Sequence, residues 1–208
     1  MTETLRAFLA VEIGESARRA AAAAAERLAR EVRGREVRWA QPRSYHLTLR
    51  FLGEISAEQA ARVAARVAEA VAPLAPFELR IGELVAFPSA RRPRVLAASV
   101  EPEAPLAELA RRVEAATLGA GLSPEARAFR PHLTLGRVRD RAHPDLGAAG
   151  PLPPEPFRVA EVVLFRSDLH PEGALHTPLE RLALGVSGPA SKPTSEGAEA
   201  HGEERPTL

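Results

Sequence analysis

The sequence predicts an α+β fold made of two similar lobes, and three observations support this prediction. Short segments rich in strand-forming residues alternate with longer segments whose apolar residues have helical spacing. The order strand, helix, strand occurs in the first half of the chain and again in the second half. The tetrapeptide His-Leu-Thr-Leu also occurs once in each half, starting at His46 and at His132, which are 86 residues apart (132 − 46). We therefore expect two lobes of the same design.

Three segments are expected to form helices. The first contains a run of alanines, which have high intrinsic helix propensity, and it is expected to end at Gly34. Ser56 is placed as the N-cap of the second helix, with Gln59 three positions later as in a capping box. The third has Leu106 and Leu109 at helical spacing. The expected helical ranges are 15–32, 56–71 and 105–118.

The remaining apolar segments are expected to be strands, because they are short and are bounded by proline or glycine. Pro42 interrupts the second of them, and Gly53 is expected to end it. A loop rich in glycine and proline, residues 139–156, separates the fifth strand from the sixth. The expected strands cover residues 5–13, 38–51, 77–87, 94–100, 129–138, 157–165 and 179–184.

The composition indicates a folded domain followed by a tail. Of the 208 residues, 45% are hydrophobic and 26% are charged, which is the mixture of an ordinary globular protein. Residues 1–185 are therefore expected to form one two-lobed domain. Residues 186–208 are rich in Gly, Pro, Ser and Glu and have almost no large apolar side chains, so we expect this C-terminal tail to be disordered.

The composition also disfavours several classes of function. Lys and Arg (28) nearly balance Asp and Glu (27), so the net charge of +1 gives no sign of a protein that coats DNA. The absence of cysteine excludes disulfides, thiolate nucleophiles and zinc fingers. No apolar run has the length of a membrane helix or the form of a secretory signal. We expect a cytoplasmic protein that acts as a monomer and does not associate with membranes.

The two His-Leu-Thr-Leu segments place equivalent side chains on one face of each strand. Alternate side chains of a strand share a face, so His46 and Thr48 lie together while the leucines point into the core. His132 and Thr134 repeat this arrangement. A single pair of this kind usually has no role, but chance recurrence of the tetrapeptide at equivalent places is improbable. If the lobes face each other across a pseudo-twofold axis, two imidazoles and two hydroxyls meet in one cleft.

Two imidazoles in one cleft can act as a general acid and a general base, because both titrate near neutral pH. Hydroxyls beside them suit an anionic group that gains charge in its transition state. In-line cleavage of a phosphodiester needs the base to activate the attacking oxygen and the acid to protonate the leaving oxygen. The sequence has neither a carboxylate cluster nor a His-Glu-x-x-His pattern, so we expect neither a metal ion nor another cofactor.

The residues around the two motifs resemble those of the two-histidine (2H) phosphoesterases. The first motif follows Arg38-Trp39 and leads into Arg50-Phe51-Leu52-Gly53, and the second lies within Phe129-Arg130-Pro131-His132. With the later segment from Leu164 to Leu169, these residues resemble the RNA 2′,3′-cyclic phosphodiesterase branch, historically called 2′-5′ RNA ligase, over roughly residues 5–184. The resemblance implies two pseudo-symmetric lobes, each an antiparallel sheet with packed helices, and an active-site cleft between the sheets.

The resemblance also implies a reaction and a role for each motif residue. The substrate would be an RNA end or a nucleotide that carries a 2′,3′-cyclic phosphate, hydrolysed without a metal ion to a 2′-phosphomonoester. His46 would be the proton donor, and His132 would be the proton acceptor that activates water. Thr48 and Thr134 would hold the non-bridging oxygens of the phosphate.

Base stacking is implied for Phe51 and Arg137, the aromatic residue and the arginine that stand five residues after each histidine. Strict alternation puts both on the face opposite the histidines, so a bulge or a strand end must turn them inward. The chain departs from the family at Leu175-His176, where a tyrosine is common. The other histidines are expected to be ordinary surface residues in loops or in the tail: His143, His170, His176 and His201.

Other functions are compatible with the same residues. The cleft could serve a phosphodiesterase of another cyclic or 2′-linked nucleotide, or a 2′-5′ RNA ligase that runs the reaction in reverse. It could also belong to a non-catalytic RNA- or nucleotide-binding module, which needs hydroxyls and arginines but no acid–base pair. No Gly-x-Ser-x-Gly elbow and no Gly-rich phosphate loop occurs, which disfavours a serine hydrolase and an ATP-driven ligase.

Overall fold

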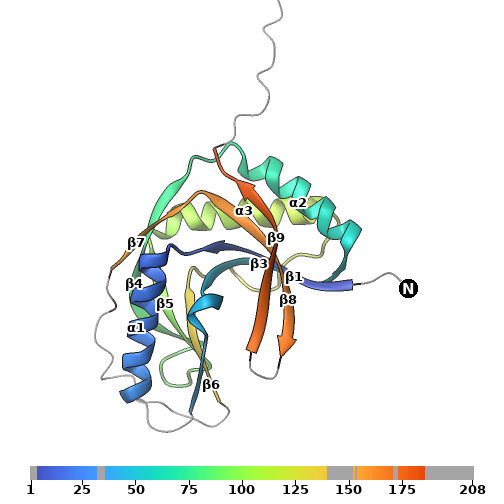
Figure 1. Ribbon diagram of the computed structural model, residues 1–208. Coiled ribbons are helices and arrows are strands. Elements are labelled where there is room, and N and C mark those ends of the chain that lie inside the picture. Colours follow the sequence, from blue (N-terminus) through green and yellow to red (C-terminus); the bar gives the residue numbers. More distant parts are fainter. Residues whose placement is uncertain (1–3, 32–35, 140–151, 153, 171–172, 186–208) are drawn as a thin grey trace, which may run out of the picture.

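The computed structural model describes residues 4–31, 36–139, 152, 154–170 and 173–185 (Figure 1). The helices are α1 (Glu15–Glu31), α2 (Ala57–Val71), α3 (Glu103–Gly119) and the short 3-10 helix η1 (Pro42–Ser44). The strands are β1 (Thr4–Glu12), β2 (Val37–Trp39), β3 (His46–Ser56), β4 (Phe77–Phe87), β5 (Val95–Glu101), β6 (Leu133–Val138), β7 (Pro156–Val159), β8 (Glu161–His170) and β9 (Gly173–Ala183). The predicted tail, 186–208, and most of the predicted 139–156 loop lie outside the described residues.

The strands form two antiparallel sheets. The first sheet has the order β3-β1-β8-β9, and the second has the order β2-β6-β5-β4-β7. The predicted α+β class, with one antiparallel sheet in each lobe, is confirmed. The first His-Leu-Thr-Leu motif forms the start of β3 in the first sheet. In the second motif, His132 directly precedes β6 of the second sheet, and the other three residues begin that strand.

The two lobes exchange elements between the two halves of the sequence. β2, from the first half, pairs with β6 of the second sheet, while β8 and β9 complete the first sheet beside β1. α1 contacts β6 and β7 of the second sheet, whereas α3 contacts β3 of the first sheet and packs on α2 (Figure 1). Each sheet therefore combines strands from both halves of the sequence.

The leucines of both motifs hold the motif strands in the core. Leu47 and Leu49 on β3 and Leu133 and Leu135 on β6 are all buried, which confirms the predicted inward direction of these side chains. Each fully buried leucine stabilises the fold by about 1.5–3 kcal/mol relative to an exposed one. The face of each strand that bears the histidine and the threonine is therefore directed away from this core.

Both motif strands contain a bulge at the same place, three residues after the histidine. On β3, Leu9 of β1 faces Arg50 and Ala10 faces Thr48, so Leu49 is an extra residue. On β6, Leu96 and Ala97 of β5 face the residues on either side of Leu135, which is the extra residue there. A bulge shifts the alternation by one position. The residues after each bulge therefore change faces relative to the motif histidine.

The expectation that Gly53 ends its strand is wrong. Gly53 lies inside β3, which continues to Ser56, and it has a positive φ of 73°. The pairing with β1 shifts here as well, because Ala7 faces Gly53 while Phe8 faces Phe51. Glycine tolerates this left-handed conformation, so the strand bulges and goes on. The predicted cap is confirmed, because the Ser56 side chain accepts a hydrogen bond from the backbone N–H of Gln59.

Candidate active site

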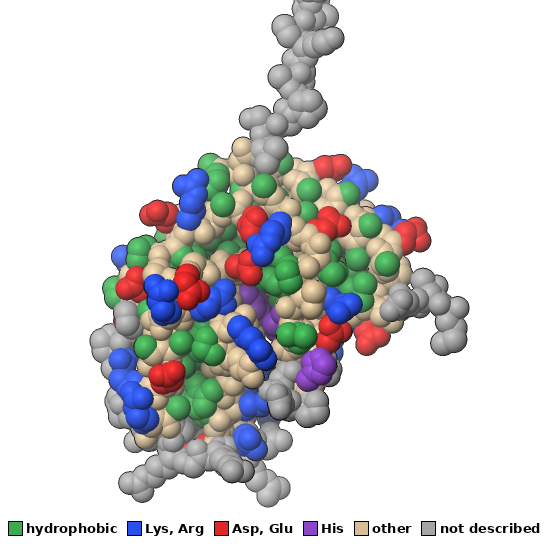
Figure 2. Space-filling view, in the orientation of Figure 1, with side chains coloured by type: hydrophobic (Ala, Val, Ile, Leu, Met, Phe, Trp, Pro, Cys, Tyr) green, Lys and Arg blue, Asp and Glu red, His purple; other side chains and the backbone are tan. Residues whose placement is uncertain are grey.

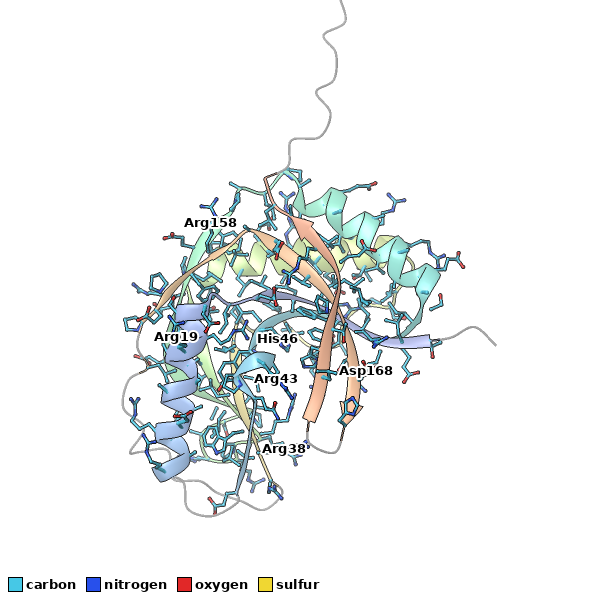
Figure 3. The ribbon with its side chains drawn as sticks, viewed as in Figure 1. Arg19, Arg38, Arg43, His46, Arg158 and Asp168 are labelled. Atoms are coloured by element: carbon cyan, nitrogen blue, oxygen red, sulfur yellow. The ribbon has the colours of Figure 1, made fainter. Side chains whose placement is uncertain are left out.

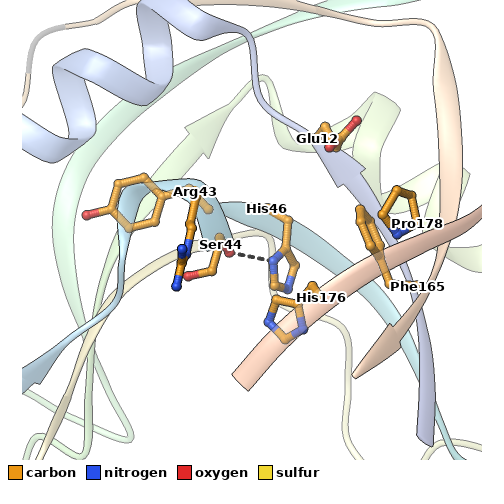
Figure 4. Close-up of a pocket in the computed structure, with 8 residues that line it drawn as sticks. Glu12, Arg43, Ser44, His46, Phe165, His176 and Pro178 are labelled. Atoms are coloured by element: carbon orange, nitrogen blue, oxygen red, sulfur yellow. Dashed lines mark hydrogen bonds between the residues drawn. The ribbon is translucent and has the colours of Figure 1, made fainter. Parts of the chain in front are cut away.

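His46 is the first residue of β3, and the backbone before it fixes the tautomer of its ring. Its Nδ1 lies 2.7 Å from the carbonyl oxygen of Ser44 (Figure 4). A carbonyl oxygen can only accept a hydrogen bond, so Nδ1 carries the proton. Nε2 of the neutral ring is then an acceptor, and it lies 3.0 Å from the hydroxyl oxygen of Thr48, which donates to it. The predicted pairing of His46 with Thr48 on one face is confirmed.

His132 repeats the arrangement of His46 at the start of the second motif. Its Nδ1 lies 2.7 Å from the carbonyl oxygen of Arg130, again two residues earlier in the chain. The same reasoning places the proton on Nδ1 and leaves Nε2 as the acceptor. The ring lies against Phe87, with centroids 5.0 Å apart, and Phe87 also has the guanidinium of Arg130 over its face. Thr134 is half-buried, and alternation along the strand places it on the side of His132.

The two motif strands lie close to each other although they belong to different sheets. β3 contacts β6, and the positive charge of His132 contributes to the pKa shift of His46. Figure 2 shows histidine side chains at the bottom of a hollow in the molecular surface, with arginines around it. Figure 3 shows His46 near the centre of the molecule, with Arg43 beside it. The structure therefore brings the two predicted histidines to one region between the sheets.

The environment of His46 keeps its imidazole neutral near neutral pH. Burial is the largest cause, and it lowers the pKa of His46 from 6.5 to about 4. The positive charge of His176 lowers the pKa further, as do the smaller effects of His132 and Arg18. The hydrogen bond to Ser44 acts in the opposite direction. The free protein therefore presents an Nε2 lone pair, not an imidazolium, at this position.

The bulges at Leu49 and Leu135 shift the alternation of each strand, so that Phe51 and Arg137 have the same register face as the motif histidines. Phe51 is 55% exposed, and its ring lies 6.1 Å from that of Phe8, which in turn lies 4.8 Å from the ring of His46. Arg137 is exposed directly after the buried Gly136 and is paired with Arg38 across β2 and β6. A Cβ at Gly136 would approach β2 to 2.7 Å, so glycine permits this close pairing beside the bulge.

His176 is a residue of this site that the sequence interpretation missed. It was expected to be an ordinary surface histidine, and that expectation is wrong. His176 lies in β9, and its ring centroid is 5.2 Å from that of His46, with the ring planes at 90°. Burial lowers its pKa as well. The sequence holds no local pattern that predicts this contact, because it arises from the pairing of β9 with β8 and of β8 with β1.

A pocket lies beside His46 (Figure 4). Arg18 positions η1 at its edge, because its Nη1 donates to the carbonyl oxygen of Pro42 at 2.8 Å. Phe165 and Pro178 form an apolar wall opposite Arg43 in this view. The lining residues are Glu12, Arg43, Ser44, Tyr45, His46, Phe165, His176 and Pro178. The pocket thus joins the first motif to the β8–β9 hairpin.

Two further observations concern the described residues only. Their His, Asp and Glu side chains form no group of three or more that could bind a metal ion. No helix among them is both long and apolar enough to cross a membrane.

Comparison with known proteins connects this geometry to a family. A family model described as LigT like Phosphoesterase matches the chain twice, at residues 11–97 and 98–176. An RNA 2′,3′-cyclic phosphodiesterase of Methanothermobacter thermautotrophicus is 32% identical over 185 residues, which cover 86% of this chain and 99% of the relative. A second protein of that name, from Archaeoglobus fulgidus, is 32% identical over 84% of this chain and 98% of its own length.

Solved structures agree with the sequence comparison. A Thermus thermophilus protein matches with a TM-score of 0.73 and 30% identity, covering 88% of this chain and 100% of that chain. E. coli LigT in complex with 3′-AMP matches with a TM-score of 0.73 and 25% identity, covering 88% and 99%. The two matched segments of the family model each contain one His-Leu-Thr-Leu motif. The chain therefore belongs to the LigT-like phosphoesterase family.

Proposed function

We propose that the protein hydrolyses the terminal 2′,3′-cyclic phosphodiester of RNA to a 2′-phosphomonoester by general acid–base catalysis. The observation that carries this proposal is the equivalence of the two imidazoles. Each donates its Nδ1 proton to a carbonyl oxygen two residues earlier, which makes Nε2 the ring atom that can exchange a proton with a substrate in both histidines. Family membership supports phosphoesterase activity, and the names of the relatives support the RNA 2′,3′-cyclic phosphate as substrate.

In the proposed reaction, one water molecule is consumed for each phosphodiester. Nε2 of His132 accepts a proton from the water as its oxygen forms a bond to phosphorus. The bond between phosphorus and the ribose O3′ breaks on the opposite side, and the Nε2 proton of His46 moves to O3′. The products are a 2′-phosphate and a free 3′-hydroxyl. The two histidines return to their starting states by exchanging one proton with solvent.

His46 must gain a proton before it can donate one, because its pKa of about 4 leaves it neutral in the free protein. A bound phosphodiester is anionic, and an adjacent opposite charge favours the imidazolium. Protonation of Nε2 also releases the Thr48 hydroxyl, which donates to that nitrogen in the free protein. Thr48 then donates to a non-bridging phosphate oxygen, and Thr134 provides the equivalent hydroxyl from the second sheet.

We also propose that residues 1–185 are the catalytic unit and that the protein acts as a monomer. Both motif strands come from one chain, and the exchange of elements between the sheets already joins the two sides of the site. Residues 186–208 contribute no group to the proposed mechanism.

The test uses a short RNA that ends in a 2′,3′-cyclic phosphate, with EDTA present. We expect complete conversion to the 2′-phosphate, identified by chromatography against 2′- and 3′-phosphate standards, at a rate that EDTA does not change. A 3′-phosphate product would contradict the proposed bond cleavage. RNA binding without any product would instead identify a binding module, and faster hydrolysis of a 2′-5′-linked dinucleotide would identify a different phosphodiesterase.

The base-stacking role of Phe51 predicts a specific kinetic change. Base–aromatic stacking contributes about 1–3 kcal/mol for each base, so we expect Phe51→Ala to raise KM about tenfold. kcat should stay within about threefold, because the phosphate contacts are retained. Phe51→Tyr is the matched control, since it keeps the aromatic face and should keep KM. A large fall in kcat at unchanged KM would assign Phe51 to the alignment of the reacting groups instead.

A further inference from the structure

The side chain of His176 completes a cluster of three rings on the first sheet. The centroid of His176 lies 5.2 Å from that of His46 and 4.9 Å from that of Phe8, and Phe8 lies 4.8 Å from His46. The His176 ring meets both neighbours edge to face, at 90° and 79°. Phe165 stacks on the other side of Phe8, with centroids 5.2 Å apart. The ring of His46 is therefore held between its own strand and β9.

The Nδ1 atom of His176 has no structural task that would explain the residue. Its Nδ1 is buried and has no hydrogen-bond partner among the described residues. Buried polar atoms that serve only the fold are usually hydrogen-bonded. An apolar ring at this place would pack against Phe8 equally well and would leave no polar atom unpaired. The observation points to a role for the imidazole in the adjacent site.

The charges of the two imidazoles are coupled because the rings are in contact. Protonation of one ring makes protonation of the other less favourable. The other charged groups near His46 come from different elements: Arg18 from α1, Arg43 from η1 and His132 from the second motif, directly before β6. Glu12 of β1 lines the same pocket, but its Oε2 accepts a hydrogen bond from Nη1 of Arg181 at 2.7 Å. His176 is the titratable group in direct ring contact with His46.

We propose that His176 is a positioning residue for His46, which fixes the plane of its ring by edge-to-face contact and places a second titratable imidazole against it. The hydrogen bond to Ser44 holds one atom of the His46 ring, and the edge-to-face contact holds its plane. This proposal rests on the proposed function, in which His46 is the proton donor. Through His176, β9 would then contribute to a reaction whose motif residues lie on or beside β3 and β6.

Three variants test the proposal. His176→Phe keeps the ring and removes the titratable nitrogens, while His176→Ala removes both. His170→Ala is the matched control, since His170 is an exposed histidine of the same hairpin. The first measurement is an NMR titration of the His46 ring without substrate. The second is kcat and KM for RNA with a terminal 2′,3′-cyclic phosphate at pH 7, with thermal melting used to confirm that each variant is folded.

The expected results differ between the variants. The titration midpoint of His46 should rise in both His176 variants, by roughly one pH unit in His176→Ala, since that change also admits water. The sign follows from the removal of a group that disfavours the charged form. kcat should fall about tenfold in His176→Ala at unchanged KM, and should stay within about threefold in His176→Phe. His170→Ala should change neither the midpoint nor kcat.

Two results would overturn the proposal. One is a His46 midpoint that stays at the wild-type value in both His176 variants. The other is the same kcat for His176→Phe and His176→Ala, because the plane of the ring would then not matter. If His176→Ala does not fold, the midpoint and kcat of His176→Phe decide. If the wild type does not hydrolyse the RNA, the proposed function fails, and the substrate-free titration still decides whether His176 controls His46.

Discussion

Replacement of either motif histidine by glutamine is expected to lower kcat about 10³-fold while KM stays within about threefold. The glutamine amide retains a hydrogen-bonding group near Nε2 but cannot transfer a proton. The change therefore removes the acid in His46→Gln or the base in His132→Gln and leaves the phosphate contacts in place. Initial rates on RNA with a terminal 2′,3′-cyclic phosphate measure this effect, and His170→Gln is the exposed-histidine control.

A change of leaving group separates the two roles. p-Nitrophenolate leaves without a proton, so a phosphodiester with this leaving group has little need of a general acid. We expect His46→Gln to lose much less activity on such a diester than on the RNA, while His132→Gln loses activity equally on both. The reverse result would exchange the roles of acid and base between His46 and His132. Activity within about tenfold of the wild type in both variants would contradict the two-histidine mechanism.

Removal of the Arg50 guanidinium is expected to lower the free energy of unfolding by about 3 kcal/mol. Arg50 is only 5% exposed and follows the bulged Leu49 on β3. Its Nε lies 2.9 Å from a carboxylate oxygen of Glu114 on α3, and its Nη1 lies 3.2 Å from one of Glu125. Nη2 also donates to the carbonyl oxygen of Ser123. Arg50 thus links the first motif strand to α3 and to the segment after it.

Arg50→Met tests this link, because methionine fills much of the same space without the charge. Urea denaturation should show the loss, and Arg62→Met should change stability by less than about 0.5 kcal/mol. Arg62 is the matched control, since it forms an exposed ion pair with Glu58 on α2. Addition of Glu114→Gln to Arg50→Met should then cost little, because the two share one interaction. A loss below about 1 kcal/mol would show that solvent compensates for the buried ion pairs.

Local patterns in the sequence predicted some elements correctly and others wrongly. The expected 157–165 strand is two strands, β7 and β8, which belong to different sheets, and the expected 179–184 strand begins earlier, at Gly173. The 77–87 strand, the Ser56 cap and the end of α2 agree with the structure, because a cap and the spacing of apolar residues act within a few positions along the chain. Strict alternation would put Phe51 and Arg137 on the face opposite the histidines, so their implied role predicted an irregularity in each strand. The bulges at Leu49 and Leu135 confirm this irregularity. The catalytic and binding roles of the six predicted residues stay predictions until the variants are measured.

Strand pairing between distant segments could not be predicted from the same patterns. The sequence does not specify that β2 joins the second sheet or that β8 lies next to β1, because these pairings depend on the packing of the whole core. The error at His176 follows from this limit, since its position depends on two successive pairings, β1 with β8 and β8 with β9. The expectation that Gly53 ends its strand failed for a different reason. A glycine in a strand can either end the hydrogen-bonded pairing or form a bulge within it, and the sequence does not distinguish the two.

The two matched bulges also determine the shape of the site. A bulge bends its strand and increases the local twist. Because Leu49 and Leu135 occupy equivalent positions on strands from opposite sheets, we expect both strands to bend just beyond their threonines. The two bends would then lie at equivalent positions on the two motif strands. If a phosphate binds between the two motifs, as proposed, the backbone spacing as well as the side chains would shape the surface that it meets.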